Sequence, residues 1–139
     1  AAVRFCEQFE NLSESCKLRL VVENDDGQNQ YSVKMLHDWV HTKIGIPITF
    51  DQHHFNYGPQ DQSMEDALRL AHSTWKTRVL THMSSPKTLE DTSGKQTAHA
   101  DYIYEHINTY GLNLDIELEA KAKELAVQKY VKQFASQLV

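Results

Sequence analysis

The sequence contains too few cysteines to be held together by disulfide bonds. Cys6 and Cys16 could form one bridge at most, and nothing in their spacing suggests the disulfide framework of a small secreted domain. Both fall in segments with helix-like spacing, so we expect free thiols in a reducing compartment. The protein is therefore expected to be intracellular, in the cytoplasm or nucleus, and not secreted.

Long apolar runs and a starting methionine are also missing. No stretch is long and apolar enough to cross a bilayer, so no membrane partner is expected. Residues 1–4 lack the apolar core of a secretion signal and resemble the interior of a longer protein. The length is sufficient for one ordinary domain with its own core, which we expect to occupy residues 1–139.

Positive charge is scarce, which weighs against nucleic-acid binding. The formal net charge is −5 with histidine neutral, whereas phosphate contacts normally call for a basic surface. The acidic balance does not exclude DNA binding, because metal ions in an acidic site add positive charge that a residue count misses. A further part of a longer protein could also carry the basic groove.

Strand-like and helix-like segments alternate four times along the chain. Strands are expected over residues 18–22, 46–50, 78–80 and 113–118. Helices are expected over residues 1–15, 32–43, 64–73, 102–110 and 121–137. Such alternation predicts an α/β fold with a parallel sheet covered by helices. A complete (β/α)8 barrel needs about 200 residues or more, so four successive βα units predict half of a TIM barrel. A small doubly wound sheet is the alternative, but the glycine-rich fingerprint of that fold is missing.

Residues that can bind metals follow every expected strand. In chain order they are Glu23, then Asp51, His53 and His54, then His82, and finally Glu119. In a βα barrel these positions lie at the C-terminal rim, where the active sites of this fold are found. A single Glu or His after a strand is usually a solvated loop residue, but repetition at successive strands favours a site for a divalent ion.

The residues alone do not decide which member of two pairs, His53 or His54 and Glu117 or Glu119, faces the expected site. Strict strand alternation would put Asp51 and His53 on one face, whereas a turn after Asp51 would present His54 instead. Alternation also points both Glu117 and Glu119 inward, although Glu119 lies nearer the rim.

Blocks of sequence in a fixed order resemble the C-terminal half of the UV DNA damage endonuclease family. They are residues 23–26 (ENDD), 50–54 (FDQHH), 82–86 (HMSSP), 99–103 (HADYI) and 119–123 (EAKAK). The resemblance implies a TIM barrel that acts as a metal-dependent DNA repair endonuclease. Such an enzyme hydrolyses the phosphodiester 5′ of a UV photoproduct or another distorting lesion in double-stranded DNA.

The resemblance also implies roles for individual residues. The implied metal ligands are Glu23, Asp51, His54, His82 and Glu119. The resemblance therefore favours His54 over His53 and Glu119 over Glu117 as ligands. The implied cofactor is a cluster of divalent ions, usually manganese, with magnesium or zinc as alternatives. All of these ligands except Asp51 are also expected to act in catalysis, and His99 matches another active-site histidine of the family.

The chain departs from the family pattern in two respects. The family commonly has a lysine, which can be modified to carry a carboxylate, two residues before the histidine that matches His82. Leu80 stands at that position. The family's first four strands, which supply further histidines and the residues that probe damaged bases, have no counterpart in this sequence. We therefore expect a partner, either an N-terminal half-barrel or a second copy of the chain, and an isolated chain without activity.

Two other functions are compatible with the same residues. A metal-dependent sugar isomerase or epimerase on the same barrel uses a similar order of ligands. A half-barrel could instead serve as a binding or structural protein without catalysis. The blocks at residues 82–86 and 99–103 favour the endonuclease.

Overall fold

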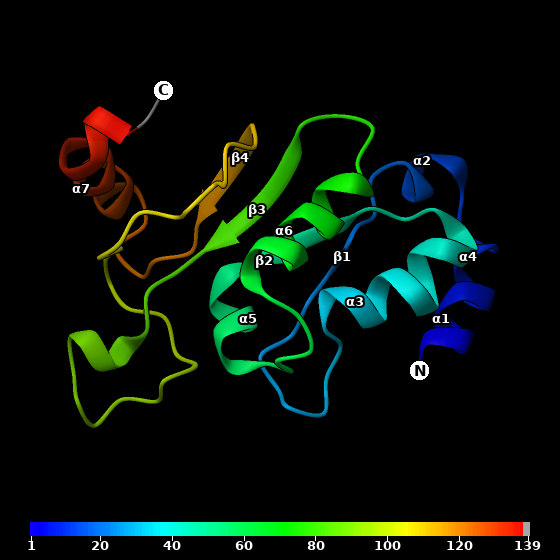
Figure 1. Ribbon diagram of the computed structural model, residues 1–139, viewed down its shortest axis with the longest axis horizontal. Helices are drawn as coiled ribbons and strands as arrows, with labels where there is room; N and C mark the ends of the chain where they lie inside the picture. Colours follow the sequence, from blue (N-terminus) through cyan, green and yellow to red (C-terminus); the bar gives the residue numbers. More distant parts are fainter. Residues whose placement is uncertain (138–139) are drawn as a thin grey trace.

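The computed structural model describes residues 1–137, and its centre is a sheet of four parallel strands in the order β1-β2-β3-β4. The strands are β1 (Val22–Glu23), β2 (Ile48–Asp51), β3 (Val79–Met83) and β4 (Leu114–Leu118). Each strand pairs in parallel with the next one along the chain. This sequential order, shown in Figure 1, is that of half of a (β/α)8 barrel, and the predicted fold class is confirmed.

Among the described residues, the connection from β3 to β4 contains only the 3-10 turn η2 (Lys87–Leu89), and helices lie before β1, in the other two connections and after β4. Those before β1 are α1 (Ala2–Phe9) and α2 (Glu14–Lys17). Those between β1 and β2 are α3 (Val33–Leu36), the π-helical segment η1 (His37–His41) and α4 (Thr42–Ile44). Those between β2 and β3 are α5 (Gln52–Tyr57) and α6 (Met64–Ser73), and those after β4 are α7 (Glu124–Phe134) and the 3-10 turn η3 (Ala135–Gln137). Helices α3 and α6 contact each other and β2, whereas α7 lies at the far end of the sheet (Figure 1).

Capping residues explain where the central helices begin and end. The Ser32 hydroxyl accepts a hydrogen bond from the Met35 amide at the start of α3, and the Ser63 hydroxyl accepts one from Asp66 at the start of α6. Gly45 follows α4 with φ of 69°, the left-handed conformation that ends a helix at little cost for glycine. The helices predicted from these residues are confirmed.

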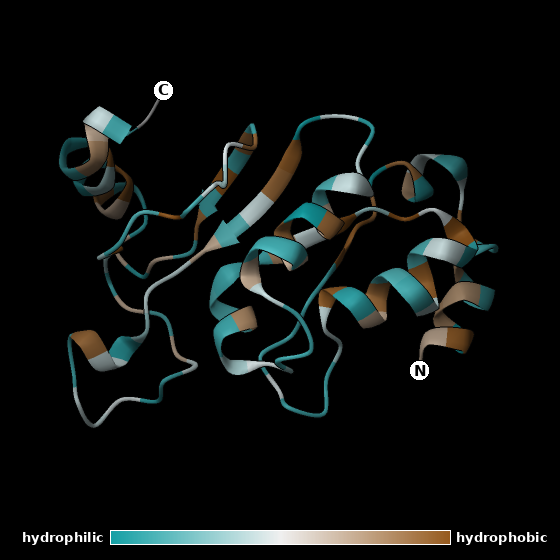
Figure 2. Cartoon of the chain, viewed as in Figure 1, coloured by the Kyte–Doolittle hydropathy of each residue, from teal (hydrophilic) through white to brown (hydrophobic). Residues whose placement is uncertain are grey.

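Strand side chains alternate between a helix-covered apolar face and a polar inward face. Ile48, Phe50 and Val79 are fully buried in the main hydrophobic cluster, and Figure 2 shows brown apolar segments along the strands. The register pairs Asp51 with His82, and these two side chains belong to the other face. The sheet therefore separates a packed core from a polar surface at its carboxyl ends.

Several boundaries differ from those expected. The strand predicted at residues 18–22 is wrong in position, because the last turn of α2 continues through Leu18, which is 86% exposed, and β1 begins only at Val22. The third strand continues to Met83, so His82 lies within it and does not follow it. The short helix α5 directly follows the second strand and was not among the expected helices.

The helix expected over residues 102–110 is also wrong, and this segment is irregular. Side chains accept hydrogen bonds from three backbone amides at its start: Asp101 and Tyr102 donate to the Glu90 carboxylate, and Tyr104 donates to the Ser85 hydroxyl. The helix-like spacing of Ile103 and Ile107 has another cause, since both are buried in a second cluster with Tyr130 and Phe134 of α7.

Both cysteines are free thiols. Cys6 is buried in α1, and Cys16 is exposed in α2. Within the described part of the chain, no helix has the length and apolar character needed to cross a membrane.

Candidate metal centre

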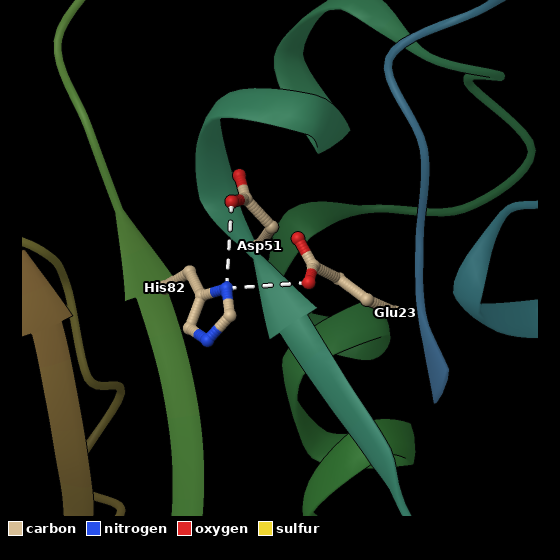
Figure 3. Close-up of side chains that lie close together, drawn as sticks. All are labelled: Glu23, Asp51 and His82. Carbon is tan, nitrogen blue, oxygen red and sulfur yellow. Dashed lines mark ion pairs between the residues drawn. The ribbon is translucent and has the colours of Figure 1, made fainter. Parts of the chain in front are cut away.

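Glu23, Asp51 and His82 point toward one another from the carboxyl ends of three adjacent strands (Figure 3). The Nδ1 atom of His82 lies 3.3 Å from Oε2 of Glu23 and 4.0 Å from Oδ2 of Asp51. One possible ligand atom from each residue lies within 4.8 Å of the other two. Because carboxylate oxygens and imidazole nitrogens are ligands for divalent cations, these side chains form a group that can hold a metal ion.

His54 joins this group because Asp51 caps the helix that follows β2. The Asp51 Oδ1 atom accepts a hydrogen bond of 2.7 Å from the His54 amide, so the chain turns into α5 directly after the strand. One turn later, Nδ1 of His54 lies 3.1 Å from Oε1 of Glu23 and 3.9 Å from Oδ2 of Asp51. The turn needed to bring His54 into the centre is therefore present.

The side chain of His53 packs against aromatic neighbours and does not contact the carboxylates of the candidate centre. Its side chain is 1% exposed, and its ring packs edge-on against Tyr57 and His99, with centroid distances of 5.0 and 5.2 Å. Burial lowers the pKa of His53, which keeps its imidazole neutral near pH 7. His53 therefore contacts His99, while His54 contacts the carboxylates.

Glu119 and His99 complete the cluster on the side of β4. The Glu119 amide donates to the Met83 carbonyl, so the β3–β4 ladder continues just past the end of β4 and directs Glu119 inward. Its Oε1 atom lies 3.8 Å from Nδ1 of His82, and its Oε2 atom lies 3.9 Å from Nδ1 of His99. The structure thus brings all the sequence-predicted site residues into one cluster, with His99 reaching it through Glu119. Their roles as ligands or catalysts stay a prediction.

Mutual contacts shift the protonation of the cluster. Burial alone would raise the pKa of Glu23, but the imidazoles of His54 and His82 outweigh it and lower this pKa to about 2. The Glu23 carboxylate in turn raises the pKa of His54 to about 9 and also raises the pKa of His82. Without a metal, the raised pKa of His54 keeps its imidazole protonated at neutral pH beside the Glu23 carboxylate.

Asp51 provides the strongest indication that the residues fit a cation. It is fully buried, and its Oδ2 atom has no hydrogen-bond partner among residues 1–137. Burial raises the pKa of Asp51, which means that its charged form is costly in this position. A buried carboxylate oxygen without a donor is unfavourable unless a cation or proton meets it, and a divalent ion among these oxygen and nitrogen ligands satisfies that need.

The sequence predicts no role for Glu117, although its side chain lies beside the candidate centre. A cavity of about 480 Å³ is lined in part by His99, Glu117, Glu119, Lys121 and Lys123. The strand alternation that points Glu117 inward was visible in the sequence. Its distance from the other residues of the cluster was not, because that depends on the register of β3 against β4.

Leu80 occupies the inward position before His82 and offers no ligand atom. Its register partner on β4 is Asp115. The departure from the family pattern at this position therefore leaves an apolar side chain on the inner face, below the candidate centre.

A parallel α/β half-barrel with polar residues gathered at the carboxyl ends of its strands has the architecture of βα-barrel enzymes, whose active sites lie at that rim. Comparison with known families makes the assignment specific. The family model described as UV-endonuclease UvdE matches residues 1–138. The chain belongs to the UV-endonuclease UvdE family.

Individual relatives agree with this assignment. The chain is 31% identical over 147 residues to the UV DNA damage endonuclease of Bacillus mycoides, covering 98% of this chain and 44% of the relative. It is 30% identical over 140 residues to that of Clostridium perfringens, covering 94% and 33% respectively. A solved structure titled "Crystal Structure of SacUVDE" superposes with a TM-score of 0.83 at 33% identity, over 98% of this chain and 46% of that one. The chain thus spans less than half the length of these relatives.

Proposed function

We propose that this chain carries part of the catalytic centre of a metal-dependent DNA repair endonuclease. The complete enzyme hydrolyses the phosphodiester 5′ of a UV photoproduct or another lesion in double-stranded DNA. The main support is the convergence of side chains from successive strand ends around the unpartnered oxygen of Asp51, in a chain of the UvdE family. An enzyme acting on chromosomal DNA works inside the cell.

The proposed ligands of the metal centre are Glu23, Asp51, His54, His82 and Glu119. Manganese is the proposed native ion, with magnesium or zinc as alternatives. Bound divalent ions lower the pKa of a coordinated water and offset charge on phosphoryl oxygens. Glu23 is suited to bridge neighbouring ions, since Oε1 faces His54 and Oε2 faces His82. Asn24 supports the ligands from outside the centre, because its carbonyl lies 2.9 Å from Nδ1 of His54.

His99 is proposed to act on the side of the substrate. It reaches the cluster only through Glu119 and lines the open cavity with Lys121 and Lys123. From there its imidazole can donate a hydrogen bond to a phosphoryl oxygen. The two lysines at the cavity can hold neighbouring phosphates of the DNA backbone.

The proposed partners are damaged double-stranded DNA and the rest of a barrel. Within residues 1–137, β1 and β4 each pair along one side only. The inward carboxylates of Asp115 and Glu117 are more than half exposed. Either an N-terminal half-barrel or a second copy of the chain would cover these edges and this face.

A nicking assay tests the proposed function. Supercoiled plasmid, irradiated with UV or left untreated, is incubated with the complete protein and Mn²⁺, and a second set of reactions contains a chelator. We expect nicks only in irradiated DNA, only with the metal, and a loss of at least about 100-fold in the Glu119→Gln variant. A sugar isomerisation assay with the same preparation tests the alternative enzyme class, and turnover there without nicking would contradict the proposal.

A further inference from the structure

Positive charge gathers near the end of a chain that is acidic overall. Residues 120–137 contain four lysines and one glutamate, whereas the whole chain has a formal net charge of −5. All four side chains are exposed, and they are Lys121, Lys123, Lys129 and Lys132. Within residues 1–137 none of them forms an ion pair, unlike Lys17, Lys34 and Lys87. Their charge is therefore available to an anionic partner.

Lys129 is held by aromatic rings and not by a carboxylate. Its Nζ atom lies 4.3 Å from the ring centroid of Tyr102 and 4.9 Å from that of Tyr104. Such contacts orient an ammonium group without neutralising it. Tyr104 is fixed in turn, since its hydroxyl donates to the Glu90 carboxylate and its amide donates to the Ser85 hydroxyl. Lys129 thus presents a full positive charge in a defined position.

The same tyrosines and one flank of α7 form a continuous surface. A hollow of about 540 Å³ is lined by Tyr102, Leu125, Gln128, Lys129 and Lys132. This hollow and the adjoining ring of Tyr104 are the lysine–tyrosine surface. It carries two lysines and two aromatic rings and no carboxylate among its lining residues, so it suits an anionic ligand.

Backbone hydrogen bonds join the lysine–tyrosine surface to the cavity beside the candidate centre. The amides of residues 121 and 122 donate to the carbonyls of residues 100 and 101. These two joined segments supply His99 and Lys121 to the cavity, and the residues that follow supply Tyr102 and Leu125 to the surface. A polyanion that passes the candidate centre can therefore continue onto this surface.

The lysine flank of α7 is not the flank suited to contact with another half-barrel. The buried stripe of this helix runs through Tyr130. With about 3.6 residues per turn, Lys129 and Lys132 lie to one side of that stripe, and Val127 and Val131 lie to the other. Both valines are exposed. Burial against the rest of a barrel suits the apolar flank and leaves the lysine flank in water.

We propose that the lysine–tyrosine surface binds the phosphate backbone of duplex DNA beside the lesion. Lys129 and Lys132 contact phosphates, and the two tyrosines hold Lys129 in place. Contacts of this kind position a protein on DNA without reading its sequence, as an enzyme that finds lesions in any sequence requires. The inference rests on the proposed function and extends the DNA contact outward from the cavity.

The salt dependence of DNA binding tests this surface without any measurement of activity. Anisotropy of a fluorescent duplex with one lesion is measured with the complete protein, in a chelator that prevents nicking. The wild type is compared with Lys129→Gln/Lys132→Gln over a range of salt concentrations. Each lost phosphate contact lowers the slope of log affinity against log salt by about 0.9, so we expect a slope less steep by about 1–2. An undamaged duplex should show the same change, because phosphate contacts do not read the lesion.

Two further comparisons control for charge and for the aromatic contacts. Lys43→Gln/Lys76→Gln removes the same charge from exposed lysines that precede β2 and β3, at the opposite end of the sheet from the rim. We expect this variant to bind DNA as the wild type does. Tyr102→Leu removes a ring beneath Lys129 and should weaken binding by about 2–5-fold, whereas Tyr102→Phe should retain wild-type affinity.

Other outcomes separate this inference from the proposed function. An unchanged salt slope in Lys129→Gln/Lys132→Gln, or an equal change in Lys43→Gln/Lys76→Gln, would overturn the inference and leave the proposed function intact. Polyglutamate that competes as well as unlabelled duplex would indicate an acidic protein partner and would also overturn it. No DNA binding by the wild type, with Mn²⁺ or with chelator, would contradict both. A native circular dichroism spectrum of each variant excludes an effect of folding.

Discussion

The side-chain amide of Asn24 is hydrogen-bonded to both backbone groups of Asp51. Its Nδ2 donates to the Asp51 carbonyl and its Oδ1 accepts from the Asp51 amide, each at 2.9 Å. Asn24 is buried and directly follows Glu23. This pair continues the contact between β1 and β2 past their last ladder pair, and it fixes Glu23 and Asp51 relative to each other.

Replacing Asn24 by alanine should therefore weaken both the fold and the centre. Two buried backbone groups lose their partners, and the expected loss in the free energy of unfolding is about 2–4 kcal/mol. Mn²⁺ affinity should fall by about 10–100-fold, as for other residues that hold ligands in place. Urea unfolding and Mn²⁺ titration check this against Asn56→Ala, an exposed position in α5. Equal behaviour of the two variants would mean that Asn24 does not hold the strand ends.

Asp51 caps α5 and is also a proposed metal ligand, and a comparison of two substitutions separates these two functions. Asp51→Asn keeps an oxygen that can cap α5 but removes the buried charge, so the metal-free protein should be as stable as the wild type or more stable. Asp51→Ala also loses the cap and should be about 1 kcal/mol less stable than Asp51→Asn. Neither variant should be stabilised by Mn²⁺ in thermal unfolding. A rise in melting temperature with Mn²⁺ in Asp51→Asn would show that Asp51 is not a ligand.

Raising the pH should strengthen cation binding and weaken the metal-free fold. Because the pKa of His54 is raised to about 9, a cation bound through this imidazole must displace its proton at neutral pH, and the raised pKa of His82 acts in the same direction. Affinity for Mn²⁺ should increase between about pH 6.5 and 9, with proton release seen in calorimetry as a dependence on the buffer's ionisation enthalpy. Affinity independent of pH over this window would exclude His54 and His82 as ligands.

The same shifts set the stability of the metal-free protein. The raised pKa of His54 stabilises the fold fully below its ordinary pKa of 6.5, and this contribution is lost as the pH rises through about 9. The lowered pKa of Glu23 stabilises the fold above its ordinary value of 4.5, and this contribution is lost as the pH falls through about 2. Urea unfolding of the metal-free protein should therefore show a decline from pH 7 to 9, which His54→Gln should reduce.

The isolated chain should not act as a monomer. The open sides of β1 and β4 and the exposed inward carboxylates favour association with another half-barrel. Light scattering on the 139-residue chain should detect self-association, and the chain should not nick irradiated DNA unless an N-terminal half is added. A well-folded monomer that nicks irradiated DNA alone would contradict the need for a partner.

Particular residues explain which parts of the fold and site the sequence could predict. The α6 boundaries follow from the Ser63 cap and the acidic first turn, which are local signals, and the prediction of 64–73 is confirmed. The segment 102–110 was mispredicted because the spacing of Ile103 and Ile107 reflects their packing against Tyr130 and Phe134 of α7, a contact that the local sequence does not reveal. Strand 18–22 was mispredicted because apolar character alone does not distinguish a strand from the last turn of α2.

The geometry of the candidate site likewise depends partly on neighbouring residues and partly on contacts between residues far apart in the sequence. The turn that selects His54 over His53 depends on the Asp51 cap, which the residue order allowed but did not require. The position of Glu117 depends on the pairing of His82 with β4, which joins residues 35 apart in the sequence. Strand alternation could indicate which residues face inward, but only the register shows which of them meet.

Anomalous diffraction from crystals of the protein grown with Mn²⁺ tests the central claim most directly. We expect an anomalous peak bonded to Glu23, Asp51 and His82 at about 2.0–2.2 Å, with His54 or Glu119 completing its ligands. Crystals of Asp51→Asn should lack this peak. Wild-type crystals with no manganese at these strand ends, or with manganese bound only elsewhere on the molecule, would contradict the assignment of a metal centre.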